Sequence, residues 1–197
     1  VKYLTSPVQT QGLIKIMIVD PTHISLLAKI QNPNTAFGAL SFSYSFEIDN
    51  SAGQSIQSVS GYSFIYPGEV KYLTAINVAV PDSSRVAQAS LAIQNYNWQP
   101  SNKMALPDIE FSNQTTTITT SSITILGVIT NKSSLALPAV NIMGILSNNL
   151  GLPAGVAKTE INSLQSLEAR QFSLVMPFVN NINPAATKIY FEVPPSI

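Results

Sequence analysis

Hydrophobic and polar residues alternate clearly over 41–48 of the chain. The even-numbered positions from Phe42 to Ile48 are aromatic or aliphatic, and the odd-numbered positions are serine or glutamate. A period of two predicts a strand with one face buried, here with the aromatic residues inward. The turn residues DNSAG follow at 49–53, and a second strand is predicted over 55–66. After YPG at the end of this strand, a third strand is predicted over 70–80.

The chain repeats itself after a shift of 131 − 32 = 99 residues. ISLLAKIQN at 24–32 falls on ITILGVITN at 123–131, and PGEVKYL at 67–73 falls on SLEARQF at 166–172. The shift aligns apolar, polar and charged positions, including a glutamate followed by a basic residue in both copies. The repeat predicts two copies of one domain, each of about a hundred residues.

Signals for helices are weak, because no stretch keeps a spacing of i, i+3, i+4 and the chain has 13 prolines. Short strands separated by turns predict an all-β fold, with two tandem Ig-like β-sandwich domains. The first domain is predicted over 13–97 and the second over 115–197, with 98–114 as a linker. Residues 1–12 have no partner in the predicted repeat and are interpreted as an N-terminal tail or an exchanged strand. The run TTTITTSSITIL at 115–126 is interpreted as one long strand, because β-branched residues alternate through it.

Charge is scarce in this chain. Ten basic and ten acidic residues give a charged fraction of 10%, against about 25% in typical soluble proteins. Neither sign is clustered, which argues against nucleic acid and acidic membranes as partners. The absence of cysteine excludes disulfides, zinc thiolate sites and thiol nucleophiles. Ser, Thr, Asn and Gln supply the polarity instead, so we expect an extracytoplasmic protein, either secreted or at the cell surface.

No apolar run approaches the about 20 residues that a membrane-spanning helix needs. The chain begins with Val1 rather than Met, and this start is interpreted as processed or truncated. Contact with a membrane is therefore expected only through an anchor segment that is absent from this sequence.

Several motifs of the first copy resemble the FxLYD and WHy domains, which are Ig-like sandwiches related to type-2 late-embryogenesis-abundant proteins. These motifs are Asn-Pro-Asn at 32–34, the turn with Gly53, and Pro-Gly-Glu at 67–69. The second copy resembles them through Gly127 and Asn131, but it lacks the Asn-Pro-Asn and the Pro-Gly. The resemblance implies an extracytoplasmic sandwich behind an N-terminal anchor helix, as in uncharacterised surface proteins of small-genome bacteria. It implies no catalytic residue, and a role in desiccation protection rests on this analogy alone.

His23 is the only histidine, and a Ser–His–Asp site would have to use it, with Asp20 as its partner. The residues from Asp20 to His23 are instead typical of a turn between two strands. Asp49 with Asn50 lacks the acidic spacing of a calcium loop.

Asp108 and Glu110 are interpreted as solvated linker residues rather than a glycosidase pair. We therefore expect no enzyme activity, no catalytic residue, no cofactor and no metal site.

Two sequons mark candidate glycosylation sites at Asn113 and Asn131. Asn113 is the better acceptor because it lies in the predicted linker, whereas Asn131 matches Asn32 at a position interpreted as structural. Lys15 and Lys29 in apolar strands are the candidates for a Lys–Asn isopeptide cross-link. Their ordinary interpretation is a lysine whose aliphatic stem lies along apolar surface.

These observations predict a non-enzymatic structural or interaction protein. Residues 1–12 are the candidate for a strand that completes the sandwich of another copy, as in a head-to-tail, pilus-like filament. Its partners would be other copies or other surface proteins. The alternative is a glycan- or ligand-binding module, and its candidate ligand-facing aromatic residues are Tyr62, Tyr66, Tyr96 and Trp98. Packing between the two domains is the competing interpretation of Trp98.

Overall fold

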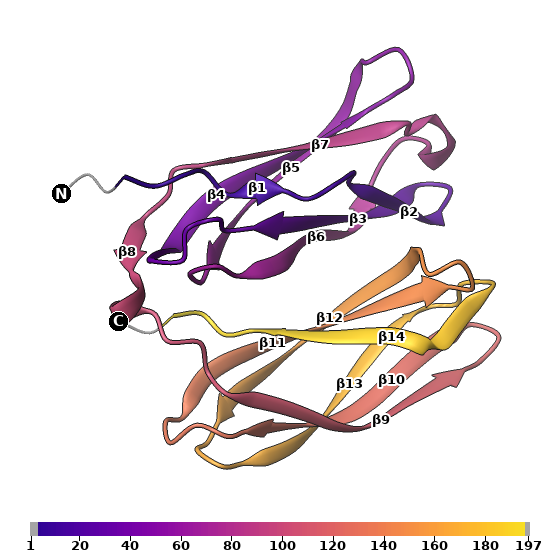
Figure 1. Cartoon of the computed structure of the whole chain (residues 1–197). Coiled ribbons are helices and arrows are strands. Elements are labelled where there is room, and N and C mark those ends of the chain that lie inside the picture. The colour runs from indigo at the N-terminus through magenta and orange to yellow at the C-terminus, as the bar shows by residue number, and fades with distance from the viewer. Residues whose placement is uncertain (1–3, 196–197) are drawn as a thin grey trace. The chain divides into compact units, whose positions relative to one another are not determined.

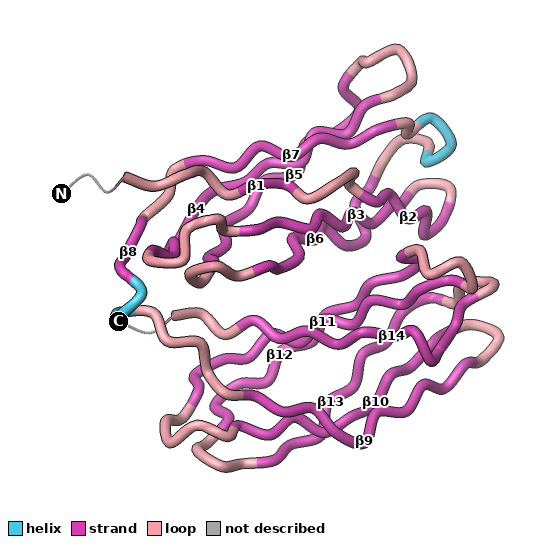
Figure 2. Tube along the Cα trace, viewed as in Figure 1, coloured by secondary structure: helices cyan, strands magenta, loops and turns pink. Residues whose placement is uncertain are grey.

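The computed structural model describes residues 4–195 of the chain. Its regular elements are strands, apart from two one-turn 3-10 helices, η1 (Ser83–Arg85) and η2 (Ser101–Lys103). The predicted all-β fold is thereby confirmed (Figures 1 and 2). Within the described part of the chain, no helix is long and apolar enough to cross a membrane.

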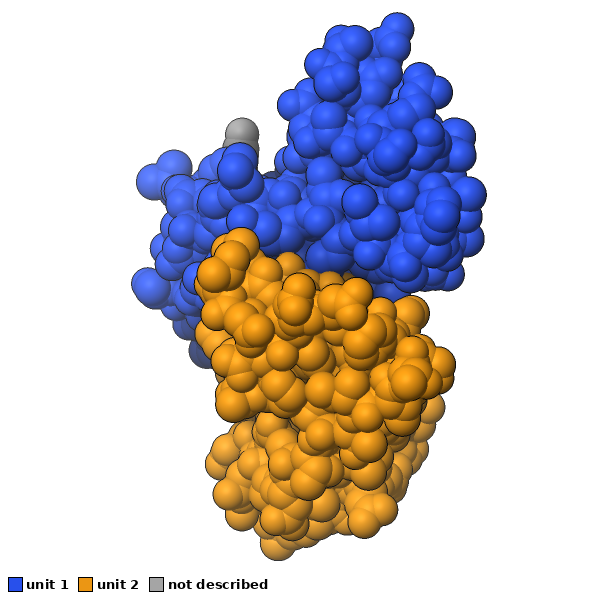
Figure 3. Space-filling view, turned by 90° about the vertical axis from the view of Figure 1, so that its right-hand side faces the viewer, with its two compact units in different colours: residues 1–105, 195–197 blue, residues 106–194 orange. Residues whose placement is uncertain are grey.

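The chain divides into two compact units, which Figure 3 colours separately. The first unit comprises residues 1–105 with 195–197, and the second comprises residues 106–194. Each unit buries its own cluster of hydrophobic side chains. Phe42 and Phe46 are completely buried in the first cluster, as the alternating pattern predicts.

One antiparallel sheet of the first unit is built around β3 (His23–Gln31). β3 pairs on one side with β6 (Val70–Ala79). On the other side it pairs with β1 (Gln9–Thr10) and then β2 (Lys15–Asp20). β1 and β2 are therefore two parts of one edge strand, separated by residues 11–14.

The other sheet of the first unit is built around β4 (Phe37–Asp49). β4 pairs on one side with β5 (Ser55–Ile65). On the other side it pairs with β7 (Gln88–Gln94) and β8 (Trp98–Pro100). The turn that joins β4 to β5 uses Gly53 with a φ of +73°, which is the role predicted for this glycine.

The second unit has the same strand order. One sheet places β10 (Ser122–Asn131) between β9 (Ile109–Ile118) and β13 (Ala169–Pro177). The other sheet places β11 (Leu137–Asn148) between β12 (Pro153–Leu164) and β14 (Ile182–Glu192). The shift of 99 residues carries β3 onto 122–130, and β10 occupies these residues.

The first residues of the chain also have a counterpart in the second unit. The shift carries β1 onto 108–109, where β9 begins. The prediction that 1–12 has no partner in the repeat is therefore wrong for Gln9–Thr10, and residues 1–3 lie outside the described residues. The predicted linker 98–114 contains β8, which pairs within the first unit, and the first half of β9, which pairs within the second.

The run 115–126 is not one strand, as the sequence predicted, but a hairpin between β9 and β10. Thr119 makes the turn: its Oγ1 accepts hydrogen bonds from the backbone amides of Ser121 (3.3 Å) and Ser122 (3.0 Å). The Thr119 amide in turn donates to the Ser122 carbonyl at 2.9 Å. This turn contains no Gly, Pro or Asn that would indicate it in the sequence.

Candidate functional site

A completely buried asparagine lies just after the central strand β3 of the first unit. Asn32 Nδ2 donates hydrogen bonds to the carbonyl oxygens of Phe37 (2.8 Å) and Tyr66 (2.9 Å). Its Oδ1 accepts from the backbone amide (3.0 Å) and the Nδ2 (2.8 Å) of Asn34. The side chain thus ties the end of β3 to the start of β4 and to the residue after β5, which is a structural role.

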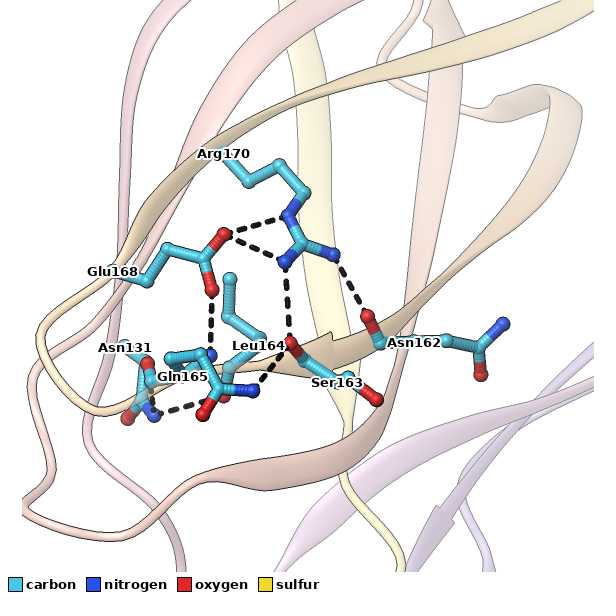
Figure 4. Close-up of polar contacts among 7 residues, drawn as sticks. All are labelled: Asn131, Asn162, Ser163, Leu164, Gln165, Glu168 and Arg170. Atoms are coloured by element: carbon cyan, nitrogen blue, oxygen red, sulfur yellow. Dashed lines mark hydrogen bonds and ion pairs between the residues drawn. The ribbon is translucent and has the colours of Figure 1, made fainter.

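Asn131 has the same role at the end of β10 (Figure 4). It is completely buried, and its Nδ2 donates to the carbonyl oxygens of Leu135 (2.8 Å) and Gln165 (3.0 Å). Its Oδ1 accepts from the backbone amide and the hydroxyl of Ser133. Because the amide nitrogen is enclosed and occupied, the prediction of Asn131 as a glycan acceptor does not fit the folded chain. Asn113 is exposed on β9 and has room for a glycan.

A charged cluster beside Asn131 fixes the turn between β12 and β13 (Figure 4). Glu168 Oε2 accepts a hydrogen bond from the Gln165 amide at 2.6 Å, and Oε1 accepts from Arg170 Nε (2.9 Å) and Nη2 (2.6 Å). Arg170 also donates to the carbonyl oxygens of Asn162 and Ser163. These partners lie in the turn and at the ends of β12 and β13 beside it, so the cluster shapes the loop.

The hydrogen bond from the Gln165 amide, together with Arg170, lowers the pKa of Glu168 below its ordinary value. The carboxylate therefore contributes stability above its unfolded pKa, and this contribution is lost as pH falls through the lowered pKa of the folded state. Glu168→Gln should lower stability at pH 7 and flatten the acid side of the stability profile. Thermal unfolding between about pH 2 and pH 7 measures this.

Glu160→Gln, at an exposed position of β12, is the matched control. Its stability should depend on pH as that of the native chain does. An acid-side slope that is equally steep in Glu168→Gln and in the native chain contradicts the assignment.

The other residues singled out for chemistry lie in turns or on the surface. His23 Nδ1 lies 2.9 Å from Asp20 Oδ2, and Asp20 Oδ1 also accepts from the Thr22 amide at 2.7 Å. The Thr22 amide and, after it, His23 lower the pKa of Asp20. This arrangement closes the turn between β2 and β3. In the described residues, no group of three or more His, Cys, Asp or Glu side chains is placed to hold a metal ion.

The remaining candidates also have surface positions. Asn50 Oδ1 accepts from the amides of Ala52 and Gln54 in the turn after β4. Glu110 forms an ion pair of 2.6 Å with Lys132. Lys15 and Lys29 are exposed, so neither lies in the buried environment that an isopeptide cross-link requires.

The four aromatic residues predicted to face a ligand do not form one cluster. Tyr62 has 85% of its surface exposed, whereas Tyr66 has 3% and is buried. Burial, followed by the nearby Glu69 charge, raises the pKa of Tyr66 to about 12. Tyr96 and Trp98 stack at 4.9 Å between ring centroids and pack against the core of the first unit.

Residues 4–11 run along the edge of β3, and Val8 is the buried side chain of this segment. Val8 is 7% exposed and belongs to the hydrophobic core of the first unit. Gln9 and Thr10 pair with Gln31 and Ile30 as the short strand β1. The Gln11 amide then donates to the carbonyl of Lys29 at 2.7 Å.

Asn34 holds this segment through its main chain. The Ser6 amide donates to Asn34 Oδ1 at 2.8 Å, and Asn34 Nδ2 donates to the Ser6 carbonyl at 2.8 Å. Asn34 also donates to the buried Asn32, which fixes its orientation. Because both contacts are to backbone groups, the clamp recognises an extended chain rather than a particular side chain. The shift of 99 places Ser133 here in the second unit, where its hydroxyl donates to Asn131 instead.

Val8 and the stacked rings of Tyr96 and Trp98 pack on the same hydrophobic core. The Tyr96 ring is 6.0 Å from the ring of Phe42, which is completely buried. Burial raises the pKa of the Tyr96 hydroxyl, and a hydrogen bond with the backbone of Val8 opposes this rise. Tyr96 therefore helps to hold the N-terminal segment, and Trp98 stacks on the Tyr96 ring. The sequence did not predict these roles.

A bulge joins the bound segment to the rest of the edge strand. Five steps from Thr10 to Lys15 oppose three steps from Ile30 to Leu27, so the edge strand carries two extra residues. Gly12 has a φ of +76°, and Leu13 is 84% exposed. The bound segment is thus connected to β2 through a stretch that loops out at Gly12 and Leu13.

Comparison with known proteins does not identify a function for this chain. No family model matches the chain, and no curated protein matches it. Among solved structures, the chain is similar to the transglutaminase of red sea bream, with 10% sequence identity and a TM-score of 0.29. The similarity covers 93% of this chain and 31% of that protein. A score this low carries no argument about function.

Proposed function

We propose that the chain is a non-enzymatic structural protein of the cell surface, whose copies assemble by exchanging the N-terminal segment 4–10. The binding mode of this segment carries the proposal. It is held by strand pairing with β3, by the Asn34 clamp and by the single buried side chain of Val8. A segment from another copy would make the same contacts, because β3, Asn34 and the core residues around Val8 do not belong to the segment.

The bulge at 11–14 supports exchange because it is the hinge that such a movement needs. Straightening it to reach a neighbour moves Gly12 and the exposed Leu13 and leaves the core beyond Ile14 in place. Intramolecular binding of a tethered segment corresponds to an effective concentration in the millimolar range. Exchange is therefore favoured where copies are crowded, as they would be when anchored side by side on a surface.

The extracytoplasmic location rests on composition. A charged fraction of 10%, with polarity supplied by Ser, Thr, Asn and Gln, suits a chain that works outside the cytoplasm. The resemblance to FxLYD and WHy domains supports the same location and an N-terminal anchor helix. The partners proposed are other copies of the chain or other proteins of the same surface.

Mixing two single-cysteine variants tests the exchange directly, since the native chain has no cysteine. Gln9 and Gln31 are directly opposed across β1 and β3. Opposed residues of antiparallel strands have Cα atoms about 4.5–5.5 Å apart, which suits a disulfide. Gln9→Cys mixed with Gln31→Cys at high concentration and then oxidised should give covalent heterodimers on a non-reducing gel.

Gln94→Cys, exposed on β7 of the other sheet, is the matched control and should give few dimers with Gln9→Cys. Dimers that form equally with both partners would reflect random collision. Lack of dimers with Gln31→Cys, while a Gln9→Cys/Gln31→Cys double variant closes its internal disulfide, would show that the segment stays in its own chain.

A further inference from the structure

The sheet β5–β4–β7 has one face in the core and one polar face in solvent. Phe42, Phe46 and Ile48 of β4 point into the core, so the serines between them point outward. The register places Tyr62 opposite Ser43, Ser60 opposite Ser45 and Ser58 opposite Glu47. We call the surface made by these six residues the serine face (Ser43, Ser45, Glu47, Ser58, Ser60 and Tyr62).

Side chains of the serine face hold one another in fixed positions. Glu47 Oε1 accepts hydrogen bonds from the hydroxyls of Ser58 (2.7 Å) and Ser45 (3.0 Å). Ser43 donates to the Gln94 carbonyl at 3.2 Å and accepts from Asn95 Nδ2 at 2.8 Å. A carboxylate ordered by neighbouring hydroxyls is a preorganised acceptor for further hydroxyl groups.

Tyr62 stands out from this polar surface as an apolar ring. It has 85% of its surface exposed, whereas Phe178, an exposed aromatic residue of the second unit, has 40%. β4 supports it from one side, and the other side of β5 is an edge of the sheet. A ring in this position has a face free for stacking and a hydroxyl for hydrogen bonding.

We propose that the serine face binds a neutral, linear oligosaccharide. The C–H groups of one sugar ring would stack on Tyr62, while hydroxyls of a further sugar donate to Glu47. Ser43, Ser45, Ser58 and Ser60 line the path between them. Tyr62 and Ser58 are four residues apart along β5, or about 13 Å at the rise of a strand. This length suits a chain of several sugar rings rather than a single monosaccharide.

The chemistry of the face selects this ligand class. Glu47 is its only charged group and is negative, so an anionic polysaccharide or nucleic acid meets repulsion rather than attraction. A second protein copy needs an apolar centre to its interface, and the serine face offers one ring among hydroxyls. The serine face lies on β4 and β5, whereas the N-terminal segment binds at the edge of β3. Sugar binding and segment exchange can therefore each fail without the other.

Binding is tested with the full chain and defined probes by calorimetry or NMR titration. The neutral probes are cellohexaose, laminarihexaose and xylohexaose, and hexagalacturonate is the anionic control. We expect at least one neutral probe to bind, and Tyr62→Ala to weaken its affinity by about tenfold or more. Glu47→Gln should also weaken it, and Ser60→Arg should block the face without touching the core.

Val175→Ala is the matched control, because Val175 is 62% exposed on β13 of the other unit. It should bind the probe as the native chain does. The proposal is overturned if no neutral probe binds, if hexagalacturonate binds as well as the best neutral probe, or if Tyr62→Ala and Ser60→Arg leave binding unchanged. Loss of self-association in Tyr62→Ala by light scattering, with no sugar binding in the native chain, would instead assign this face to contacts between copies.

Discussion

Asn131→Asp should destabilise the protein severely at neutral pH, although it changes a single NH₂ group to oxygen. The Nδ2 of Asn131 donates to the carbonyls of Leu135 and Gln165 inside a completely buried site. A buried polar group left without its partner costs about 1–3 kcal/mol. Two such carbonyls facing a carboxylate oxygen therefore give an expected loss of roughly 2–6 kcal/mol at pH 7. A domain stability of about 5–15 kcal/mol makes this a large fraction of the total.

The pH dependence of this variant identifies the cause. Burial and the facing carbonyls raise the pKa of the introduced carboxyl in the folded state above its unfolded value of about 3.9. The folded variant is then relatively most stable below the unfolded pKa, where the protonated carboxyl donates a hydrogen bond. This advantage is lost as pH rises through the raised folded pKa.

Urea unfolding at about pH 4, 5.5 and 7 measures the effect, as the difference between variant and native chain at each pH. The deficit should shrink as pH falls. Asn113→Asp, at an exposed position, is the control and should stay close to the native chain throughout. If Asn131→Asp stays within about 0.5 kcal/mol of the native chain at pH 7, the buried amide is not what holds the loop.

The second large effect is expected at Gly127, which lies opposite Phe172 across β10 and β13. A Cβ on Gly127 would lie 2.6 Å from Cζ of the Phe172 ring, and this ring is 5% exposed. In the first unit the shift of 99 places Ala28 and Leu73 here, and they are also directly opposed and buried. The two units thus fill the equivalent space with different pairs, Gly127 with Phe172 in the second unit and Ala28 with Leu73 in the first.

Gly127→Ala alone should cost about 1–3 kcal/mol through overpacking, and Phe172→Leu alone should cost about 1–2 kcal/mol through the cavity it leaves. The double variant carries the pair of the first unit and should recover most of the loss. Urea unfolding of all four proteins forms a double-mutant cycle, with an expected coupling of about 1–3 kcal/mol in favour of the double variant. Additive losses would show that Phe172 turns away freely and that the glycine is not needed for its ring.

The alternating pattern was enough to predict β4 and the burial of its aromatic residues. Phe42 and Phe46 are completely buried, and the turn glycine Gly53 has the positive φ that its position required. The pairing of Asn32 with Asn131 in the repeat also pointed to a structural role, which their hydrogen bonds show. The strand and the turn depend on residues close together in sequence, and the role of the asparagines was found by comparing the two copies of the repeat.

Other features had no local signal. The turn at 119–122 is made by a threonine hydroxyl within a run of β-branched residues, which hides it among strand formers. The charged cluster of Glu168 and Arg170 was seen as a match between repeats, but its contacts to the Gln165 amide and the Asn162 carbonyl were not predictable. Such contacts depend on the path of a loop, which side-chain types alone do not define.

The sequence by itself determined the all-β fold, the repeat of 99 residues and the positions of the buried asparagines, because strand periodicity and turn chemistry act over a few residues. Only the tertiary structure decided what the N-terminal segment and the four aromatic residues do. Val8 enters a core built from strands distant in sequence, Tyr96 and Trp98 pack against the same core, and Tyr62 is the one of the four that is largely exposed. The reason is physical: alternation specifies which face of a strand is apolar, whereas the strand beside it and the surface it covers follow from packing across the whole unit.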